Sequence, residues 1–121
     1  MASPVVEVKT IEQLIEANSV KYDVSADLMH HIVKNESTYN PTAEGDVKYV
    51  CTSKKSPLFN QVAPSYGLVQ INSCWHPDVS YAQATSPEFA IEFLAKNLSE
   101  GRCYLWSTCK GLPQELAVLV P

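Results

Sequence analysis

One carboxylate, Glu36, stands where an apolar helical stripe meets a run of helix-ending residues. The stripe consists of Leu28, Met29, Ile32 and Val33. Glu36 continues it, three residues past Val33 and four past Ile32. Removal of a carboxylate from water disfavours its charged form and raises its pKa, which suits a general acid near neutral pH. The pattern predicts such an acid here; the alternative is a solvated carboxylate at a frayed helix end.

A second carboxylate, Asp46, follows in a stretch with little periodicity. Glycosidases that use water or a covalent intermediate need two carboxylates beside the bond that breaks. Asp46 could reach across a cleft to position a water molecule for Glu36. The alternative is an Asx turn with Gly45, the ordinary use of such a pair in a loop. If Asp46 faces Glu36, hydrolysis becomes the better interpretation.

Two short segments carry the most specific pattern: "ESTYNPTAEGD" (residues 36–46) and "SYGLVQIN" (residues 65–72). Together they resemble the paired motifs of the lytic transglycosylase and goose-type lysozyme group. In that group a glutamate-serine pair ends a helix, and a G-L-x-Q-I segment builds the facing wall of a glycan cleft. The resemblance covers roughly residues 10–109. The matching residues are Glu36, Ser37, Tyr39, Asn40, Pro41, Ala43, Ser65, Gly67, Leu68, Gln70, Ile71 and Asn72.

The resemblance implies a mainly α, lysozyme-like fold in which a helical domain and a small lobe border a glycan cleft. Glu36 would protonate the glycosidic oxygen between N-acetylmuramic acid and N-acetylglucosamine, then act as base on the departing sugar's own hydroxyl. The product would carry a 1,6-anhydro end. One acid suffices for this reaction, and neither a metal ion nor an organic cofactor is expected. A hydrolytic muramidase that uses Asp46 is the alternative.

Substrate-binding roles are expected for polar and aromatic residues of both motifs and of the late chain. Ser37 is expected to bond the substrate or Glu36, or simply to end its helix. Gln70, placed on a short helix, would contact the sugar near Glu36, and Gly67 would allow a close backbone approach. The whole expected set is Ser37, Tyr39, Ser65, Gly67, Gln70, Asn72 and Trp106, with Tyr39 and Trp106 as aromatic cleft walls.

The late chain departs from the family pattern. Many lytic transglycosylases carry a Tyr-Asn-Ala-Gly motif in a late helix, whereas this chain has "RCYLWSTC" (residues 102–109) in the corresponding stretch. Whether Tyr104 or Trp106 replaces the missing tyrosine stays open. The other aromatic residues, Trp75 among them, are expected to pack in the core or the lobe.

Four cysteines, Cys51, Cys74, Cys103 and Cys109, predict two disulfides and an extracytoplasmic location. Of three pairings, Cys51 with Cys74 and Cys103 with Cys109 is favoured, because each closes a local loop. On the chain-entropy model these loops contribute about 3 and about 2 kcal/mol. A zinc site competes, but the spacing lacks the close C-x2-C pair of structural sites. The three histidines carry no nucleophile or metal motif, so no metal is expected.

Caps and periodicity predict the elements that position these residues. They are a helix over 11–19, a second over 25–36 that Pro41 stops, an irregular or short β-hairpin lobe over 42–64, a short helix near 65–72 and a long helix over 86–101. The first opens with a Thr10–Gln13 capping box, and the last with Ser86 before Pro87. Residues 111–121 are either a last core segment, which is favoured, or a mobile tail.

Length and composition limit the classes of function that the sequence allows. The 121 residues, 45% of them hydrophobic, predict one domain over 1–121, expected to be monomeric. Nine basic residues are scattered among 13 acidic ones, with a net charge of -4, so neither nucleic acid nor an anionic membrane surface is expected as partner. No apolar run reaches the roughly 18 residues of a membrane span, and the first residues lack a secretory-signal pattern.

Two hypotheses outside enzymology compete with glycan cleavage. A peptidoglycan-binding module would keep the cleft without turnover, although an intact Glu36 argues against it. A small structural or inhibitor domain held by disulfides would have no affinity for muropeptides.

Overall fold

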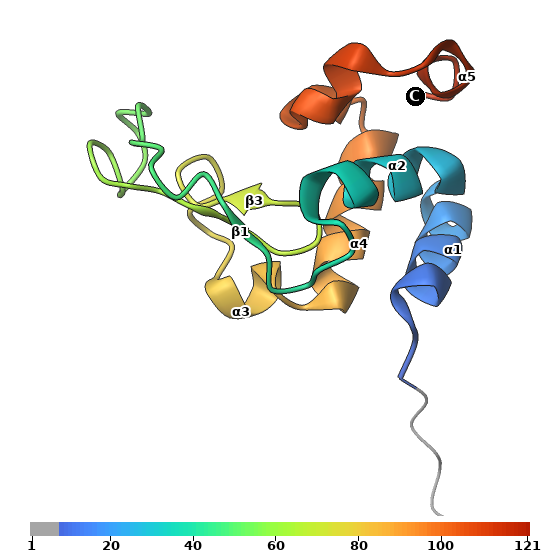
Figure 1. Ribbon diagram of the computed structural model, residues 1–121, viewed down its shortest axis with the longest axis horizontal. Coiled ribbons are helices and arrows are strands. Elements are labelled where there is room, and N and C mark those ends of the chain that lie inside the picture. Colours follow the sequence, from blue (N-terminus) through green and yellow to red (C-terminus); the bar gives the residue numbers. More distant parts are fainter. Residues whose placement is uncertain (1–7) are drawn as a thin grey trace, which may run out of the picture.

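Three helices form the main body of the protein, and a small sheet extends to one side of them (Figure 1). The computed structural model describes residues 8–121. In α1 (Ile11–Tyr22), Thr10 and Gln13 form the predicted capping box, with reciprocal hydrogen bonds of 2.9 and 3.1 Å. The helix ends at Tyr22, later than predicted, because Asp23 takes the left-handed conformation there.

The helix that carries Glu36 is α2 (Ala26–Ser37). Ser25 caps it, accepting a hydrogen bond from the backbone N–H of Leu28 at 3.2 Å. Thr38 and Tyr39 leave the helix in left-handed conformations, ahead of Pro41. The predicted start and stop are both confirmed, and Glu36 lies in the last turn of an intact helix.

Helix α4 (Pro87–Ser99) packs against α1, and the core lies between the helices. Ser86 caps it, Pro87 occupies its first turn, and Gly101 follows its end with a positive φ of 79°. The fully buried side chains of this core include Ile15, Leu28, Met29, Ile32, Leu68, Ile91, Leu94 and Leu98. An exposed ion pair of 2.7 Å between Lys21 and Glu92 also joins α1 to α4.

The sheet has three short antiparallel strands in the order β1 (Glu44–Gly45), β2 (Ser65–Tyr66) and β3 (Ile71–Asn72). The helix predicted near residues 65–72 is therefore wrong: the segment is a β2–β3 hairpin. Its turn places Gly67 at φ 86° and Gln70 at φ 52°, which a helix cannot accommodate.

Gly67 serves the close approach that the sequence predicted. A side chain at this position would collide with the backbone carbonyl of Ala84 in α3 (Tyr81–Ala84), a short helix that the sequence analysis missed. The Gly67 N–H also donates to the Ala43 carbonyl at 2.8 Å. The hairpin turn is thus pressed between two backbone segments, where only glycine fits.

We call residues 42–77 the sheet lobe. The predicted disulfide Cys51–Cys74 crosses it, and a bridge between Val50 and Val62 pairs its outer part. The buried residues Cys51, Ala63 and Cys74 form a second small core there. The irregular lobe predicted over residues 42–64 is therefore present, and it extends past Pro64 to include the β2–β3 hairpin and Cys74.

After α4 the chain forms two 3-10 turns, η1 (Cys103–Leu105) and η2 (Ser107–Gly111), which the second predicted disulfide, Cys103–Cys109, joins. A last short helix, α5 (Gln114–Ala117), follows. Leu112 and Val120 are partly buried against the main core, but none of residues 111–121 is fully buried, and Val118 and Leu119 are exposed. The segment thus lies on the surface of the core, which only partly fits the favoured interpretation of it as a core segment. None of the helices within residues 8–121 has the length and apolarity that crossing a membrane requires.

Candidate active site

Glu36 is half-buried at the end of α2 and accepts a hydrogen bond from the side chain of Thr108. The distance between Thr108 Oγ1 and Glu36 Oε2 is 3.2 Å. Thr108 belongs to η2, so the segment of residues 102–109 does reach the carboxylate. It does so through a threonine that sequence reasoning missed, and through neither Tyr104 nor Trp106.

The pKa of Glu36 is raised above its ordinary value. Burial is the main cause, because it removes water from the carboxylate, and the negative charge of Asp46 adds to it. The Thr108 hydrogen bond acts in the opposite direction, since it stabilises the charged form. The frayed-end alternative is wrong, because α2 continues past Glu36 to Ser37.

The Glu36 hollow is a cavity of about 270 Å³ between the end of α2, the sheet lobe and the two 3-10 turns. It is lined by Glu36, Asp46, Tyr49, Ser65, Gln70, Asn72, Trp75, Leu105 and Ser107. Five of the residues singled out from the sequence meet here: Glu36, Asp46, Ser65, Gln70 and Asn72. Side chains far apart in the sequence thus converge on one carboxyl group.

Asp46 is held by a polar network on the sheet. Ser65 Oγ donates to Asp46 Oδ2 at 2.6 Å, and Asn72 Nδ2 donates to Ser65 Oγ at 3.0 Å. Asn72 Nδ2 also donates to the Ala63 carbonyl at 2.9 Å. The Asp46 carboxylate is therefore engaged across the sheet by β2, which differs from the local Asx turn considered as its alternative. Asp46 and Glu36 face the same cavity.

Gln70 lies on the hairpin turn, where the sequence analysis had placed a helix. Its Nε2 donates to two backbone carbonyls, those of Ala43 at 3.1 Å and Gly67 at 3.0 Å. Its Oε1 lies so close to Gly45 that a side chain at position 45 would collide with it. Gln70 therefore fastens the strand that leads to Asp46 to the hairpin turn, while it also lines the Glu36 hollow.

Several expected site residues lie outside the Glu36 hollow. Ser37 Oγ donates to the Val33 carbonyl at 3.1 Å. Ser37 therefore has the helix-ending role that was the alternative to a bond with the substrate or Glu36. The Tyr39 hydroxyl meets His30 Nδ1 at 2.9 Å, so Tyr39 is not a wall of this cavity. Trp106 is 3% exposed, and its Nε1 donates to the Val69 carbonyl at 2.7 Å. Gly67 is buried behind the hairpin and has the packing role described above.

The aromatic wall consists mainly of a residue that the sequence analysis assigned to packing. Trp75 is 56% exposed and lines the Glu36 hollow together with Tyr49. A clue was available, because Trp75 directly follows Cys74, whose predicted disulfide fixes the tryptophan backbone to the lobe. An exposed indole held in this way offers a flat apolar face to a sugar ring.

The Trp106 hollow, about 210 Å³, adjoins the Glu36 hollow. The two have Gln70, Asn72, Trp75 and Leu105 in common, so they are neighbours, and we call them together the groove. Trp106 and the 70% exposed Tyr104 both line this second part of the groove. His76 also borders it, and burial lowers the pKa of this histidine despite the nearby Asp78. The part of the groove that lies beyond Glu36 therefore has aromatic side chains in its lining.

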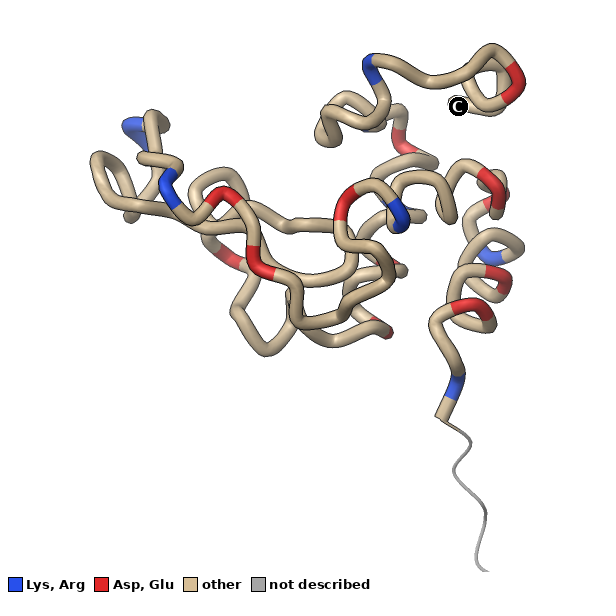
Figure 2. Tube along the Cα trace, in the orientation of Figure 1, with Lys and Arg blue, Asp and Glu red and all other residues tan. Residues whose placement is uncertain are grey.

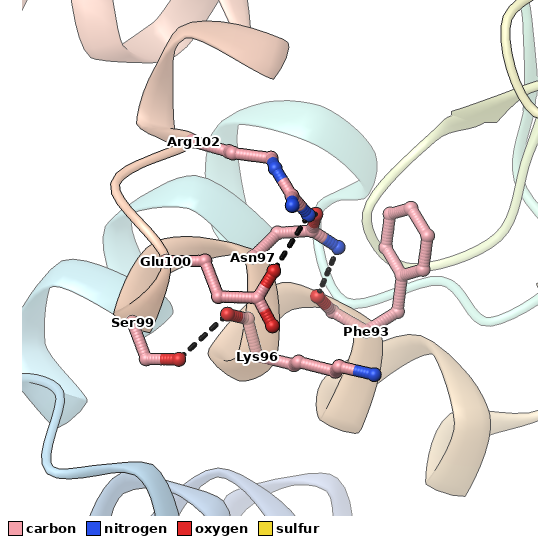
Figure 3. A network of polar contacts seen from close by, with 6 residues as sticks. All are labelled: Phe93, Lys96, Asn97, Ser99, Glu100 and Arg102. Atoms are coloured by element: carbon pink, nitrogen blue, oxygen red, sulfur yellow. Dashed lines mark hydrogen bonds and ion pairs between the residues drawn. The ribbon is translucent and has the colours of Figure 1, made fainter.

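Figure 3 shows the polar network that leads from α4 into η1. Arg102 pairs with Glu100 at 2.7 Å and donates to Asn97 Oδ1 at 3.0 Å, while Asn97 Nδ2 donates to the Phe93 carbonyl at 2.8 Å. These bonds fix the direction in which the chain leaves α4. They thereby position the 3-10 turns that carry Leu105, Ser107 and Thr108 to the groove.

Within residues 8–121, no group of three or more His, Cys, Asp or Glu side chains is arranged to hold a metal ion. The chemistry that the groove offers is that of one half-buried acid, one hydrogen-bonded carboxylate and aromatic surfaces. Comparisons with protein-family models, with curated proteins and with solved structures found no match to this chain.

Proposed function

We propose that this protein is a lysozyme-like enzyme that cleaves the glycan strands of peptidoglycan between N-acetylmuramic acid and N-acetylglucosamine. The observation that carries the proposal is Glu36, a carboxyl group with a raised pKa that lines one of two neighbouring hollows with aromatic residues in their walls. The two sequence motifs that resemble the lytic transglycosylase and goose-type lysozyme group supply most of the polar lining of that groove. No cofactor is needed for this reaction.

In the first step Glu36 donates its proton to the glycosidic oxygen, and the bond to the anomeric carbon breaks. Positive charge then develops on the sugar ring, next to the newly formed Glu36 carboxylate and to Asp46. In the second step Glu36 accepts a proton from the nucleophile that attacks the anomeric carbon. A raised pKa suits both steps, because the group must hold its proton before cleavage and regain it afterwards.

The nucleophile is either water or the sugar's own hydroxyl. The sequence alone favoured the intramolecular route, which needs a single acid. Asp46 changes this preference, because it lines the same cavity as Glu36 and Ser65 holds its carboxylate there. A carboxylate in this position can orient water for attack, so we propose hydrolysis as the main reaction. Formation of 1,6-anhydro ends, the lytic transglycosylase reaction, is the second candidate.

Product analysis on purified sacculi tests the proposal. Mass spectrometry of the released fragments separates the two routes, because an anhydro end is lighter by one water. We expect mainly hydrated ends from the native protein and a shift toward anhydro ends from Asp46→Asn. Hydrated ends in unchanged proportion from Asp46→Asn would remove Asp46 from the mechanism.

A Glu36→Gln variant separates the enzyme from a non-catalytic module. We expect a loss of dye release from labelled sacculi of about 10²-fold to 10⁴-fold, the usual contribution of a general acid. Ser37→Ala is the matched control, since Ser37 adjoins Glu36 but bonds only its own helix. If the native protein binds sacculi but releases no dye, the binding-module hypothesis replaces the enzyme. If it does not bind at all, a structural or inhibitor domain does.

Two disulfides fit a protein that works in an oxidising, extracytoplasmic compartment, where peptidoglycan is found. We therefore propose that this chain acts outside the cytoplasm, as a monomer, on glycan strands.

A further inference from the structure

The sheet lobe contains a third cavity, which we call the Lys55 hollow. It measures about 230 Å³ and is lined by Ser53, Lys55, Ser56, Cys74, Trp75 and Pro77. Trp75 lines this hollow as well as the Glu36 hollow and the Trp106 hollow. Lys55 therefore lines a hollow that shares its exposed tryptophan with the groove.

The charge of this region is opposite to that of the whole chain. The net charge is -4, yet between Asp46 and Asp78 the sequence contains Lys48, Lys54 and Lys55 and no Asp or Glu. Figure 2 shows basic positions toward the outer end of the lobe and acidic positions nearer the helices. Within residues 8–121, the ion pairs are Lys21–Glu92 and Arg102–Glu100, and neither lies on the lobe. Lys55 thus brings a positive charge that no ion pair of the described residues neutralises.

The backbone around Lys55 is held in a defined turn. Ser56 N–H donates to the Ser53 carbonyl at 3.0 Å, and Leu58 N–H donates to Ser56 Oγ at 3.2 Å. Ser56 itself is buried. Asn60 N–H donates to the carbonyl of Cys51, which the disulfide joins to Cys74 beside Trp75. The backbone segments that carry Lys55 and Trp75 therefore belong to one unit that the Cys51–Cys74 disulfide ties together.

The same unit is linked to the acid site. The N–H of Cys74 donates to Asn72 Oδ1 at 2.9 Å, and the amide nitrogen of Asn72 donates to the Ser65 hydroxyl that holds Asp46. Residues that line the Lys55 hollow and the Glu36 hollow are thus connected by a chain of hydrogen bonds.

We infer that Lys55 binds a carboxylate of the peptide stem that peptidoglycan carries on its N-acetylmuramic acid, while Trp75 supports the sugar. The inference rests on the proposed function, and it names peptide-bearing, anionic strands as the preferred substrate. Stem peptides carry free carboxylates, and a lysine ammonium is a compact point charge that attracts a carboxylate without requiring one orientation. The serine hydroxyls of the hollow add hydrogen-bond donors.

The test compares two adjacent lysines and two forms of one substrate. Lys55→Gln removes the charge in the hollow, and Lys54→Gln removes an equal charge from the same turn, at a residue that does not line it. The substrates are soluble peptide-bearing glycan strands and the same strands after their carboxylates have been converted to amides with carbodiimide and ammonia. KM and kcat are measured for each combination at low ionic strength.

We expect amidation to raise the KM of the native protein about fivefold with little change in kcat, the effect of losing one partly exposed ion pair. Lys55→Gln should show the same raised KM on untreated strands and no response to amidation, whereas Lys54→Gln should behave like the native protein. Equal KM values for the two variants on untreated strands, or a Lys55→Gln variant that still responds to amidation, would overturn the inference.

Equilibrium binding by Glu36→Gln distinguishes this inference from the proposed function. The same strands are titrated into Glu36→Gln with Lys55 present or replaced by Gln. Binding that weakens with Lys55→Gln and with amidation supports the carboxylate site even if the native protein proves inactive. Binding that is indifferent to both changes overturns the site even if the native protein cleaves sacculi.

Discussion

The helical body and the sheet lobe differ in what holds them together and in what they contribute to the groove. The three main helices bury long aliphatic side chains, and their starts and ends follow from local caps. The sheet lobe has strands of only two residues and is held by a disulfide, backbone turns and the Asp46–Ser65–Asn72 network. The body contributes one carboxyl group to the groove, whereas the lobe contributes most of the remaining lining. The main hydrophobic core and most of the lining of the Glu36 hollow thus lie in different regions.

The position of Glu36 between the helical body and the sheet lobe explains its raised pKa. The hydrophobic body supports the last turn of α2, and the lobe and the 3-10 turns close around that turn and reduce its contact with water. The pKa of Glu36 rises mainly because of this burial. A change in the body should therefore act on the stability of the whole protein, and a change in the lobe should act mainly on the site.

The largest effect on stability is expected in the body. Leu94 is fully buried on α4, and Leu94→Ala should lower the free energy of unfolding by about 2–5 kcal/mol, through lost burial and the cavity left behind. Val20→Ala is the control, because Val20 is 76% exposed on α1 and should cost less than about 0.5 kcal/mol. Urea unfolding measures both. Equal effects of the two substitutions would contradict the assignment of the core.

Removal of the lobe disulfide should have the next largest effect. Replacing Cys51 and Cys74 by Ala should cost about 3 kcal/mol on the chain-entropy model, and the loss should be local. Amide hydrogen exchange should accelerate in residues 44–77 while α1 and α4 keep their protection. A uniform rise in exchange across the chain would show that the two regions do not differ in this way.

The Ser65 hydroxyl should matter more for activity than for folding. Ser65→Ala deprives Asp46 of a donor and Asn72 of an acceptor, and should cost about 1–3 kcal/mol of stability. It should also lower the share of hydrated product ends. Ser73→Ala is the matched change on the same lobe, since Ser73 Oγ donates only to the Pro64 carbonyl. If both variants give the same products, Ser65 does not position Asp46 for the reaction.

The smallest effect is expected from Thr108→Val, which keeps the shape of the side chain and removes the hydrogen bond to Glu36. That bond holds the pKa of Glu36 down, so its loss should raise the pKa further. Because the acid must be protonated, the alkaline limb of the pH–rate profile should move to higher pH. Thr85→Val, which alters a remote bond to the Tyr81 carbonyl, should leave the profile in place. A shift toward lower pH would contradict the role of Thr108.

The three main helices and the disulfide pairing could be predicted because their signals are local. Thr10, Ser25 and Ser86 cap the helices as expected, and the apolar stripe of α2 correctly placed Glu36 at a half-buried helix end. The hairpin at residues 65–72 was missed, because "GLVQI" has the apolar content of a short helix. Its turn depends on a contact between Gly67 and Ala84, which no local pattern reveals.

Only part of the groove could be predicted, because the rest of it also depends on contacts that no local pattern reveals. Residues within the two motifs were found, yet Thr108 and Trp75 were missed as site residues because their positions depend on the disulfides and on the direction of the chain after α4. Tyr39 and Trp106 were expected as walls of the cleft from their residue type. Tyr39 instead bonds His30 and lines neither hollow. Trp106 does line the groove, in the Trp106 hollow, while its indole N–H donates to the backbone carbonyl of Val69.

The central claim is that Glu36 holds its proton to higher pH than an ordinary carboxyl group because the groove buries it. The ¹³C carboxyl resonance of Glu36, followed by NMR during a pH titration, measures this directly. Its folded-state pKa is raised, so its contribution to stability is fully present below the unfolded pKa and is lost as pH rises through the folded pKa. We predict a midpoint above the ordinary value of 4.5. A midpoint at or below 4.5 would contradict the account.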